Sequence, residues 1–133
     1  MFKRKILSKL EAWKRDERHK PLILRGARQV GKTTVVNEFG SQFDNYLYFN
    51  LEMNESVRLF EMDIPLNDLV NMLFASLGKS QREGSTLIFI DEIQNSPKTI
   101  ALLRYFYEQR PDLYVIAAGS LLENLVDVNV SFP

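Results

Sequence analysis

The chain has 133 residues, of which 45% are hydrophobic and 26% are charged, so it can bury one continuous core and is neither disordered nor collagen-like. Its 17 basic and 17 acidic side chains cancel, which argues against a protein whose whole surface binds nucleic acid or a membrane. The lack of cysteine excludes disulfides, a thiolate nucleophile and Cys-ligated zinc, and one histidine excludes a multi-histidine metal site.

The two parts of the chain differ in charge. Residues 1–32 carry 11 basic and 3 acidic side chains, whereas residues 33–133 carry 6 basic and 14 acidic ones. An anionic ligand would be attracted to the first part, although a solvated basic helix alone would give the same count.

A membrane protein is not expected. No apolar run approaches the roughly 18 residues that span a bilayer, and the N-terminal residues lack a signal-peptide core. A cysteine-free chain suits a reducing compartment, so we expect a cytoplasmic protein with no membrane partner.

The first turns of the chain are expected to be helical. Phe2, Ile6, Leu10 and Trp13 recur at helical spacing among basic and acidic residues, which predicts an amphipathic helix over about residues 2–18. Such a helix would cover the edge of a sheet; a helix lying on a membrane surface is the alternative.

Further along, short apolar runs alternate with amphipathic stretches. Strands are predicted at 22–24, 46–51, 87–90 and 113–118, and helices at 32 to about 43, 54–60, 65–77, 96 to before 111, and 121–126. Asn54 is predicted to cap its helix, Pro65 to open the next one, and Ser96-Pro97 to be a cap followed by proline at the first helical position. The apolar face of the 65–77 helix comprises Leu69, Met72, Leu73 and Leu77. The alternation predicts a single α/β domain with a parallel sheet buried on both faces.

A phosphate-binding motif lies between the first predicted strand and the next helix. Residues 26–33 match G-x-x-x-x-G-K-[ST], in which the glycines let backbone N–H groups and the helix N-terminus approach a phosphate. Lys32 would reach the β- and γ-phosphates, the Thr33 hydroxyl would bind Mg²⁺, and Thr34 would lie near the α-phosphate. The candidate nucleotide-binding residues are Gly26, Ala27, Arg28, Gln29, Val30, Gly31, Lys32, Thr33 and Thr34. Arg28 and Gln29 either touch the ligand or face solvent.

An acidic pair follows the third predicted strand. Asp91 and Glu92 come directly after the apolar run 87–90, at the carboxyl end of a strand where α/β sheets place ligand-binding groups. Asp91 is predicted to bind Mg²⁺ through water, as in a Walker B motif, and Glu92 to polarise the attacking water as general base. By itself such a pair caps a helix; the phosphate loop upstream favours the catalytic interpretation.

Other polar residues at strand ends are weaker candidates. Ser120 would contact the γ-phosphate or the attacking water, or would only form a turn or helix cap. Asn50 would hydrogen-bond Glu92 and hold it away from water until a partner binds. Gln94 and Asn95 are interpreted as turn and capping residues.

These motifs together resemble a known family. Residues 21–34, Ile90-Asp91-Glu92-Ile93-Gln94 and Ala118-Gly119-Ser120 are similar to the N-terminal ATPase domain of an AAA-type P-loop family of bacteria and archaea. Members usually carry a further C-terminal domain. The resemblance implies a three-layer α/β/α P-loop NTPase fold with sheet order 5-1-4-3-2 that binds Mg-ATP.

The chain departs from that family at its C-terminal side. No arginine follows Arg110, so a downstream arginine finger or sensor is missing, and only thirteen residues follow Ser120 where the family has its fifth strand. We therefore expect residues 1–133 to be one C-terminally truncated domain with core strand order 1-4-3-2 and the first strand at an edge. An exposed edge would invite self-association.

The leading functional hypothesis is Mg-ATP binding and hydrolysis by a switch or motor domain, with weak activity in the absence of the missing part. The alternative is a nucleotide-binding module with negligible hydrolysis, because an arginine finger is worth about 10³–10⁵ in rate. A nucleic acid or protein partner, including DNA, is expected for the full-length protein. No Asn-Lys-x-Asp motif occurs, which disfavours a GTPase; a small-molecule kinase using Arg104 and Arg110 stays open.

Overall fold

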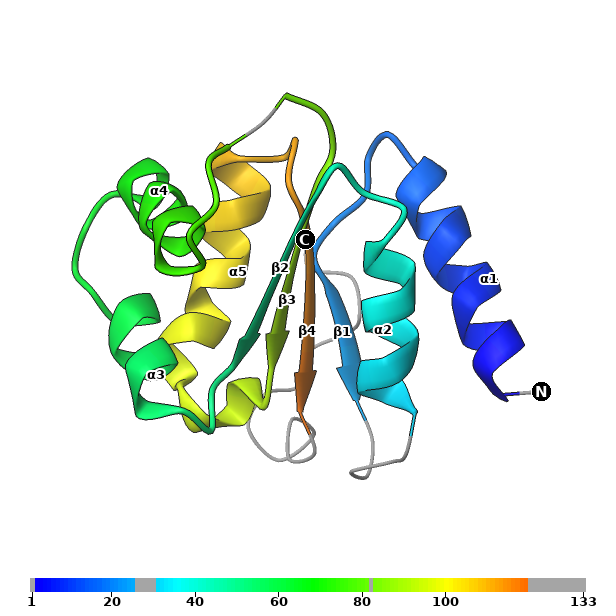
Figure 1. Ribbon diagram of the computed structural model, residues 1–133, viewed down its shortest axis with the longest axis horizontal. Coiled ribbons are helices and arrows are strands. Elements are labelled where there is room, and N and C mark those ends of the chain that lie inside the picture. Colours follow the sequence, from blue (N-terminus) through cyan, green and yellow to red (C-terminus); the bar gives the residue numbers. More distant parts are fainter. Residues whose placement is uncertain (1, 26–30, 82, 120–133) are drawn as a thin grey trace.

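The computed structural model describes residues 2–25, 31–81 and 83–119 (Figure 1). A central sheet separates two helical layers, with α1 and α2 on one face and α3, α4 and α5 on the other. The elements are α1 (Phe2–Arg15), β1 (Leu22–Arg25), α2 (Lys32–Gly40), β2 (Asn45–Asn50), α3 (Asn54–Phe60), α4 (Leu66–Ser76), β3 (Thr86–Asp91), the 3₁₀ turn η1 (Ile93–Asn95), α5 (Pro97–Gln109) and β4 (Tyr114–Gly119).

The four strands are parallel and lie in the order β1-β4-β3-β2. This confirms the predicted three-layer P-loop NTPase fold with core order 1-4-3-2, in which β1 is an outer strand among the four that the structure describes. Arg25 pairs with Gly119, and Asn50 pairs with Asp91, so the carboxyl ends of the strands meet at one edge of the sheet. Residues 120–133, and with them the predicted helix at 121–126 and the question of a fifth strand, lie outside the described residues. Self-association through a sheet edge stays a prediction.

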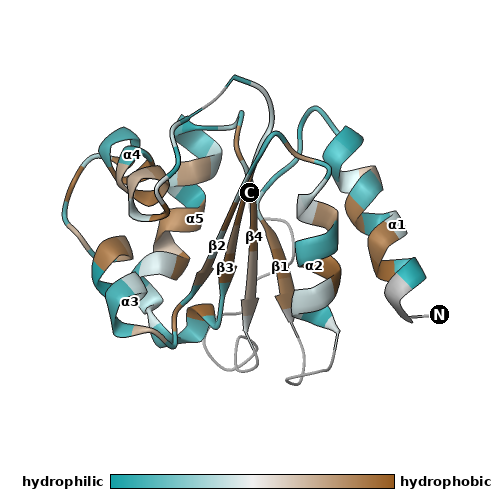
Figure 2. Ribbon diagram, viewed as in Figure 1, coloured by the Kyte–Doolittle hydropathy of each residue, from teal (hydrophilic) through white to brown (hydrophobic). Residues whose placement is uncertain are grey.

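Each face of the sheet has its own apolar core. β3 is buried at every position, while β2 alternates buried and half-buried residues, because only the inner strand has a neighbour on both sides. Leu47, Ile88 and Val115 pack under α3, α4 and α5, whereas Phe89 and Ile116 pack under α2 and α1. In Figure 2 the central strands are brown, which marks hydrophobic residues, and the outer helices carry many teal, hydrophilic residues.

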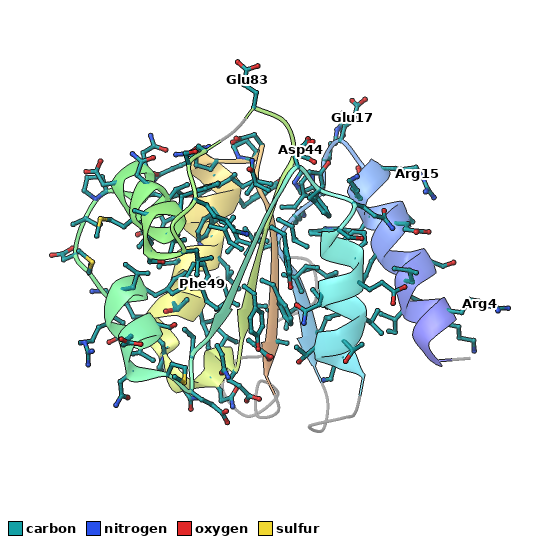
Figure 3. The ribbon with its side chains drawn as sticks, viewed as in Figure 1. Arg4, Arg15, Glu17, Asp44, Phe49 and Glu83 are labelled. Carbon is teal, nitrogen blue, oxygen red and sulfur yellow. The ribbon has the colours of Figure 1, made fainter. Side chains whose placement is uncertain are left out.

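The apolar side of α1 is used inside the fold. Leu10 is 1% exposed and shares a core with Val36 and Phe39, so α1 packs on α2 instead of along the edge of the sheet. Arg4 and Arg15 point away from the protein on the outer side of α1 (Figure 3). No helix in the described ranges is both long and apolar enough to span a bilayer.

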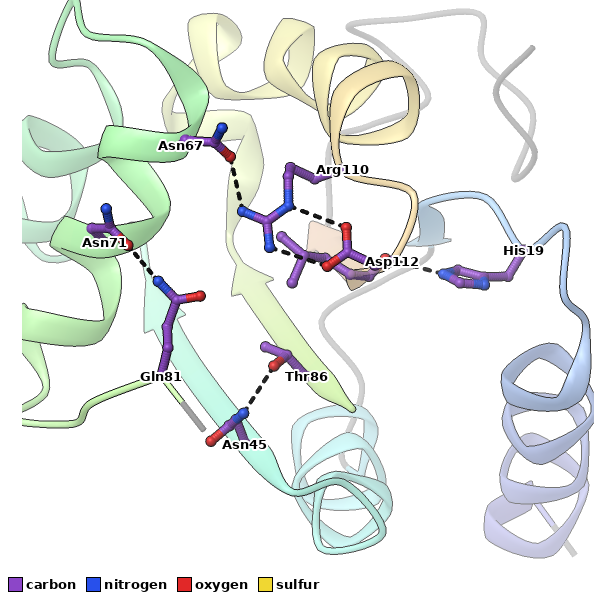
Figure 4. Close-up of polar contacts among 9 residues, drawn as sticks. His19, Asn45, Asn67, Asn71, Gln81, Thr86, Arg110 and Asp112 are labelled. Atoms are coloured by element: carbon purple, nitrogen blue, oxygen red, sulfur yellow. Dashed lines mark hydrogen bonds and ion pairs between the residues drawn. The ribbon is translucent and has the colours of Figure 1, made fainter. Parts of the chain in front are cut away.

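The segment after α1 is tied to the opposite end of the sheet from the strands' carboxyl ends. His19 stacks on Tyr114 with 3.8 Å between ring centroids, and its Nε2 lies 3.0 Å from the carbonyl oxygen of Leu113 (Figure 4). Trp13 belongs to the same aromatic cluster and donates from Nε1 to the carbonyl of Lys20 over 2.7 Å. These contacts fix where β1 enters the sheet.

Several element boundaries differ from the predictions. α1 ends at Arg15 and not at about 18, because a turn follows in which the amide of His19 donates to the carbonyl of Asp16. α2 ends at Gly40 and not near 43, and a Cβ at Gly40 would lie 2.6 Å from the ring of Tyr46, so this position needs glycine.

The predicted starts of the next helices are also shifted. Met53, not Asn54, occupies the cap position of α3, and Pro65 precedes α4 without being part of it. Met72 and Leu77 were expected on the apolar face of α4 but are 41% and 39% exposed, because the neighbouring helices do not cover that side. The predicted start of α5 is confirmed, since Ser96 accepts a hydrogen bond from the amide of Thr99 and proline follows it.

Candidate functional site

The site begins at the N-terminus of α2. Gly31 precedes the helix with φ 104° and ψ −19°, a left-handed conformation that favours glycine, and its carbonyl accepts the first helical bond from Val35. Lys32, Thr33 and Thr34 therefore form the first turn of α2, where N–H groups lack intrahelical partners and attract anions. The other predicted loop residues, Gly26, Ala27, Arg28, Gln29 and Val30, lie outside the described residues.

Asp91 ends β3 beside this turn and is 8% exposed. Its Oδ2 accepts hydrogen bonds from Thr33 Oγ1 and from the Tyr48 hydroxyl, both over 3.0 Å, and its Oδ1 accepts one from the amide of Glu92 over 3.0 Å. Two candidates that are 58 positions apart in the sequence, Thr33 and Asp91, are thus in direct contact.

The oxygens of Thr33 and Asp91 suit a magnesium ion. Mg²⁺ prefers hard oxygen ligands at about 2.0–2.1 Å in an octahedron, where neighbouring ligands are about 2.9 Å apart. The 3.0 Å between Thr33 Oγ1 and Asp91 Oδ2 is close to that separation, which fits direct coordination by both oxygens, whereas the sequence predicted that Asp91 binds the ion through water. Within the described ranges there is no group of three or more His, Cys, Asp or Glu side chains that would form a protein-only cage, so phosphate oxygens and water would complete the shell.

Tyr48 is a site residue that the sequence reasoning missed. Its ring packs on Phe89, with 5.3 Å between centroids, and its hydroxyl donates to Asp91. Burial first, and then the negative charge of Asp91, raises the pKa of Tyr48 far above its ordinary value. The hydroxyl is therefore a protonated donor at every physiological pH.

Glu92 follows Asp91 in an unusual backbone conformation. Its φ of 55° and ψ of 45° are left-handed, and among the described residues no other non-glycine residue has a positive φ. Its Oε1 accepts a hydrogen bond from Gln94 Nε2 over 2.9 Å. The sequence gives no glycine or proline signal for this reversal.

The predictions for the neighbouring polar residues have different outcomes. The predicted bond between Asn50 and Glu92 is not formed, because Asn50 Oδ1 accepts instead from the amide of Glu52 over 2.9 Å. Gln94 and Asn95 lie in the 3₁₀ turn η1, as predicted. In addition, the side chain of Gln94 donates to Glu92, and that of Asn95 donates to the carbonyl of Leu51 over 3.2 Å. Ser120 lies outside the described residues.

A family model described as an AAA domain matches residues 18–131, which is most of the chain. The chain belongs to this AAA domain family. Membership makes it a nucleotide-binding ATPase module and agrees with the resemblance found in the sequence. No curated protein matches this AAA domain.

Two solved structures share the fold of this AAA domain. The Orc1 protein of Aeropyrum pernix in complex with DNA superposes with a TM-score of 0.60 at 17% identity, over 96% of this chain and 40% of that one. PCH-2 of C. elegans gives a TM-score of 0.57 at 15% identity, over 99% of this chain and 43% of that one. The chain thus spans less than half the length of either protein.

Proposed function

We propose that this AAA domain binds Mg-ATP at the N-terminus of α2 and hydrolyses it slowly. The observation that carries the proposal is the 3.0 Å contact between Thr33 and Asp91, which joins the phosphate-binding motif to the acidic end of β3. A glycine turn that opens a helix, with a carboxylate facing the helix N-terminus, is the arrangement that a magnesium-bound phosphate needs.

Different residues of the site would bind different parts of Mg-ATP. The loop of residues 26–31 would supply backbone N–H groups to the phosphates, Lys32 would neutralise the β- and γ-phosphates, and Thr34 would lie near the α-phosphate. Thr33 and Asp91 would hold Mg²⁺, which when bound neutralises charge on the phosphates. Ser120 stays a candidate for contact with the γ-phosphate or the attacking water.

Glu92 would act as the general base. A water oxygen attacks the γ-phosphorus, the bond to the β–γ bridging oxygen breaks, and the water's proton passes to the Glu92 carboxylate. Glu92 is half-buried and adjoins Asp91, so it lies next to the place where the phosphates would be held.

Hydrolysis is expected to be slow because Arg110, the last arginine of the chain, is not placed to serve as an arginine finger within it. Arg110 pairs with Asp112 over 3.0 Å and donates to Asn67 over 2.9 Å (Figure 4). It precedes β4, whereas Asp91 ends the parallel strand β3, so the two residues lie at opposite ends of the sheet. Arg110 is equally unsuited to a kinase lid over this site. A nucleotide-binding module with negligible turnover remains the competing function until turnover is measured.

The test separates binding from hydrolysis. We expect Lys32→Ala to abolish Mg-ATP binding in calorimetry, Glu92→Gln to keep binding and lose turnover, and the exposed control Lys9→Ala to change neither. If Glu92→Gln hydrolyses ATP at the wild-type rate, the general-base assignment is wrong and the binding module stands. If Lys32→Ala binds as wild type does, the nucleotide site itself is wrong.

We also propose nucleic acid as the partner class of the full-length protein. Arg4, Lys5, Lys9 and Arg15 are exposed on α1, whose apolar side is buried, and the similar Orc1 structure is a complex with DNA. Binding of a DNA duplex should weaken steeply between 50 and 200 mM salt, by roughly tenfold or more for the few contacts available. Replacing the four side chains by glutamine should abolish it, whereas Arg104→Gln on α5 should not. Absent or salt-independent binding would exclude this partner.

A further inference from the structure

The turn after β3 returns the side chain of Gln94 to Glu92. The left-handed Glu92 reverses the chain, and the amide of Asn95 donates to the carbonyl of Glu92 over 3.2 Å. Ile93 is fully buried and Asn95 is bonded to Leu51, so Gln94 lies between two anchored residues. The 2.9 Å bond from Gln94 Nε2 to Glu92 Oε1 is therefore held by the backbone on both sides.

The Gln94 amide makes this bond at a cost to the fold. Its Oε1 is buried and has no hydrogen-bond partner among the described residues. A buried acceptor without a donor destabilises a protein. Rotating the Gln94 amide by 180° would not remove this cost. The amide oxygen would then face Glu92 Oε1, and two acceptors cannot form a hydrogen bond. Stability alone does not explain a glutamine here.

The carboxylate of Glu92 is held at one oxygen only. Oε1 accepts from Gln94, and Oε2 has no hydrogen-bond partner in the described part of the chain. A general base needs a defined position and an oxygen free to accept a proton. The bond to Gln94 fixes the position of the carboxylate through Oε1 and leaves Oε2 free to accept a proton.

We infer that Gln94 is a positioning residue that fixes the Glu92 carboxylate by Oε1 and presents Oε2 to the attacking water. The inference rests on the proposed function, since it gives Gln94 a role only if Glu92 is the general base. It adds a residue that acts through Glu92 and does not itself touch the nucleotide. A purely structural turn residue would instead act through the stability of the fold.

The first variant is Gln94→Met, which keeps the length of the side chain and removes both the donor to Glu92 and the unpaired acceptor. We expect kcat for ATP to fall about tenfold, a part of the roughly 10²–10⁴-fold that a positioned general base contributes. The KM and the Kd for Mg-ATP should stay within about twofold and the Tm should not fall. Gln81→Met, at an exposed glutamine bonded to Asn71, is the matched control and should change none of these.

A double-mutant cycle separates positioning from structure. In a Glu92→Gln background, Gln94→Met should have no further effect on single-turnover hydrolysis, because the group that it positions is gone. An equal loss in both backgrounds, an unchanged or raised kcat in Gln94→Met alone, or a lowered Tm that accounts for the loss would overturn the inference.

Failure of the inference is distinguishable from failure of the proposed function. If Glu92→Gln is inactive while Gln94→Met is fully active, only the positioning role falls. If Glu92→Gln is fully active, or the wild-type chain does not hydrolyse ATP, the catalytic proposal falls and the positioning role with it. The contact between Gln94 and Glu92 can be checked by NMR without nucleotide. Glu92→Ala should shift the two side-chain amide proton resonances of Gln94, and unchanged resonances would exclude the bond.

Discussion

Tyr48 and Thr33 donate hydrogen bonds to the same oxygen of Asp91, each over 3.0 Å. The two donors come from β2 and from the first turn of α2, so the carboxylate joins both elements at the carboxyl edge of the sheet. Outer partners of this kind orient a metal-binding carboxylate, and their loss typically weakens metal affinity 10–100-fold. Tyr48 would thus tune a site that it does not itself form.

The first prediction follows from this bond. Tyr48→Phe keeps the ring on Phe89 but removes the donor to Asp91, so we expect the Mg²⁺ concentration needed for half-maximal ATP binding to rise about tenfold. ATP binding without Mg²⁺ should not change. Magnesium titrations followed by calorimetry would measure the effect, with Tyr105→Phe on an exposed side chain as control. An unchanged magnesium requirement would show that Tyr48 is only a packing residue.

The second prediction concerns alkaline pH. Burial and Asp91 raise the pKa of Tyr48 far above its ordinary value of 10.0, so the folded protein keeps this proton where the unfolded chain loses it. The stabilisation that the protonated Tyr48 hydroxyl contributes to the fold is fully present below about pH 10, and it is lost as the pH rises above that value. Tyr48→Phe should therefore lose less stability than the wild type between pH 9 and pH 11. Urea denaturation across this range would test it, and parallel stability curves for the two proteins would contradict it.

The parts of the site that the sequence could predict are the residues that directly follow the carboxyl ends of the strands. In a parallel sheet the residues after each strand meet at one edge, so Asp91, directly after an apolar run, had to approach the helix that Lys32 opens. The strand order follows from the same alternation of strands and helices, together with the family resemblance. Neither inference needs the position of any single side chain.

The missed contacts depend on details that the residue types do not signal. Gln94 reaches Glu92 only because Glu92 adopts a left-handed conformation, which a glutamate rarely takes. Tyr48 reaches Asp91 through the register of β2 against β3, which is set by packing on both faces. Met72 fits the helical period of α4 but is exposed, because burial also requires a neighbouring element on that side.

The third prediction compares two glycines with left-handed conformations. Gly31 precedes α2 with φ 104°, and Gly78 follows α4 with φ 68° and has nothing within 4 Å of an added Cβ. Alanine at either position should destabilise the fold by about 1–2 kcal/mol through backbone strain. Only Gly31→Ala should also abolish Mg-ATP binding, because it displaces the N–H groups that would face the phosphates. Thermal unfolding and calorimetry on both variants would decide, and equal ATP affinity in the two would remove Gly31 from the site.

The fourth prediction compares Thr33 with its neighbour Thr34 on the first turn of α2. Valine has the shape of threonine without the hydroxyl, so Thr33→Val removes the bond to Asp91 and the proposed magnesium ligand with little change in packing. We expect the gain in ATP affinity on adding Mg²⁺ to disappear in Thr33→Val and to persist in Thr34→Val, whose predicted contact is with the α-phosphate. The measurement is the ratio of ATP dissociation constants with EDTA and with Mg²⁺. If both variants keep the wild-type ratio, Thr33 does not bind the ion and the short contact to Asp91 serves only to join α2 to β3.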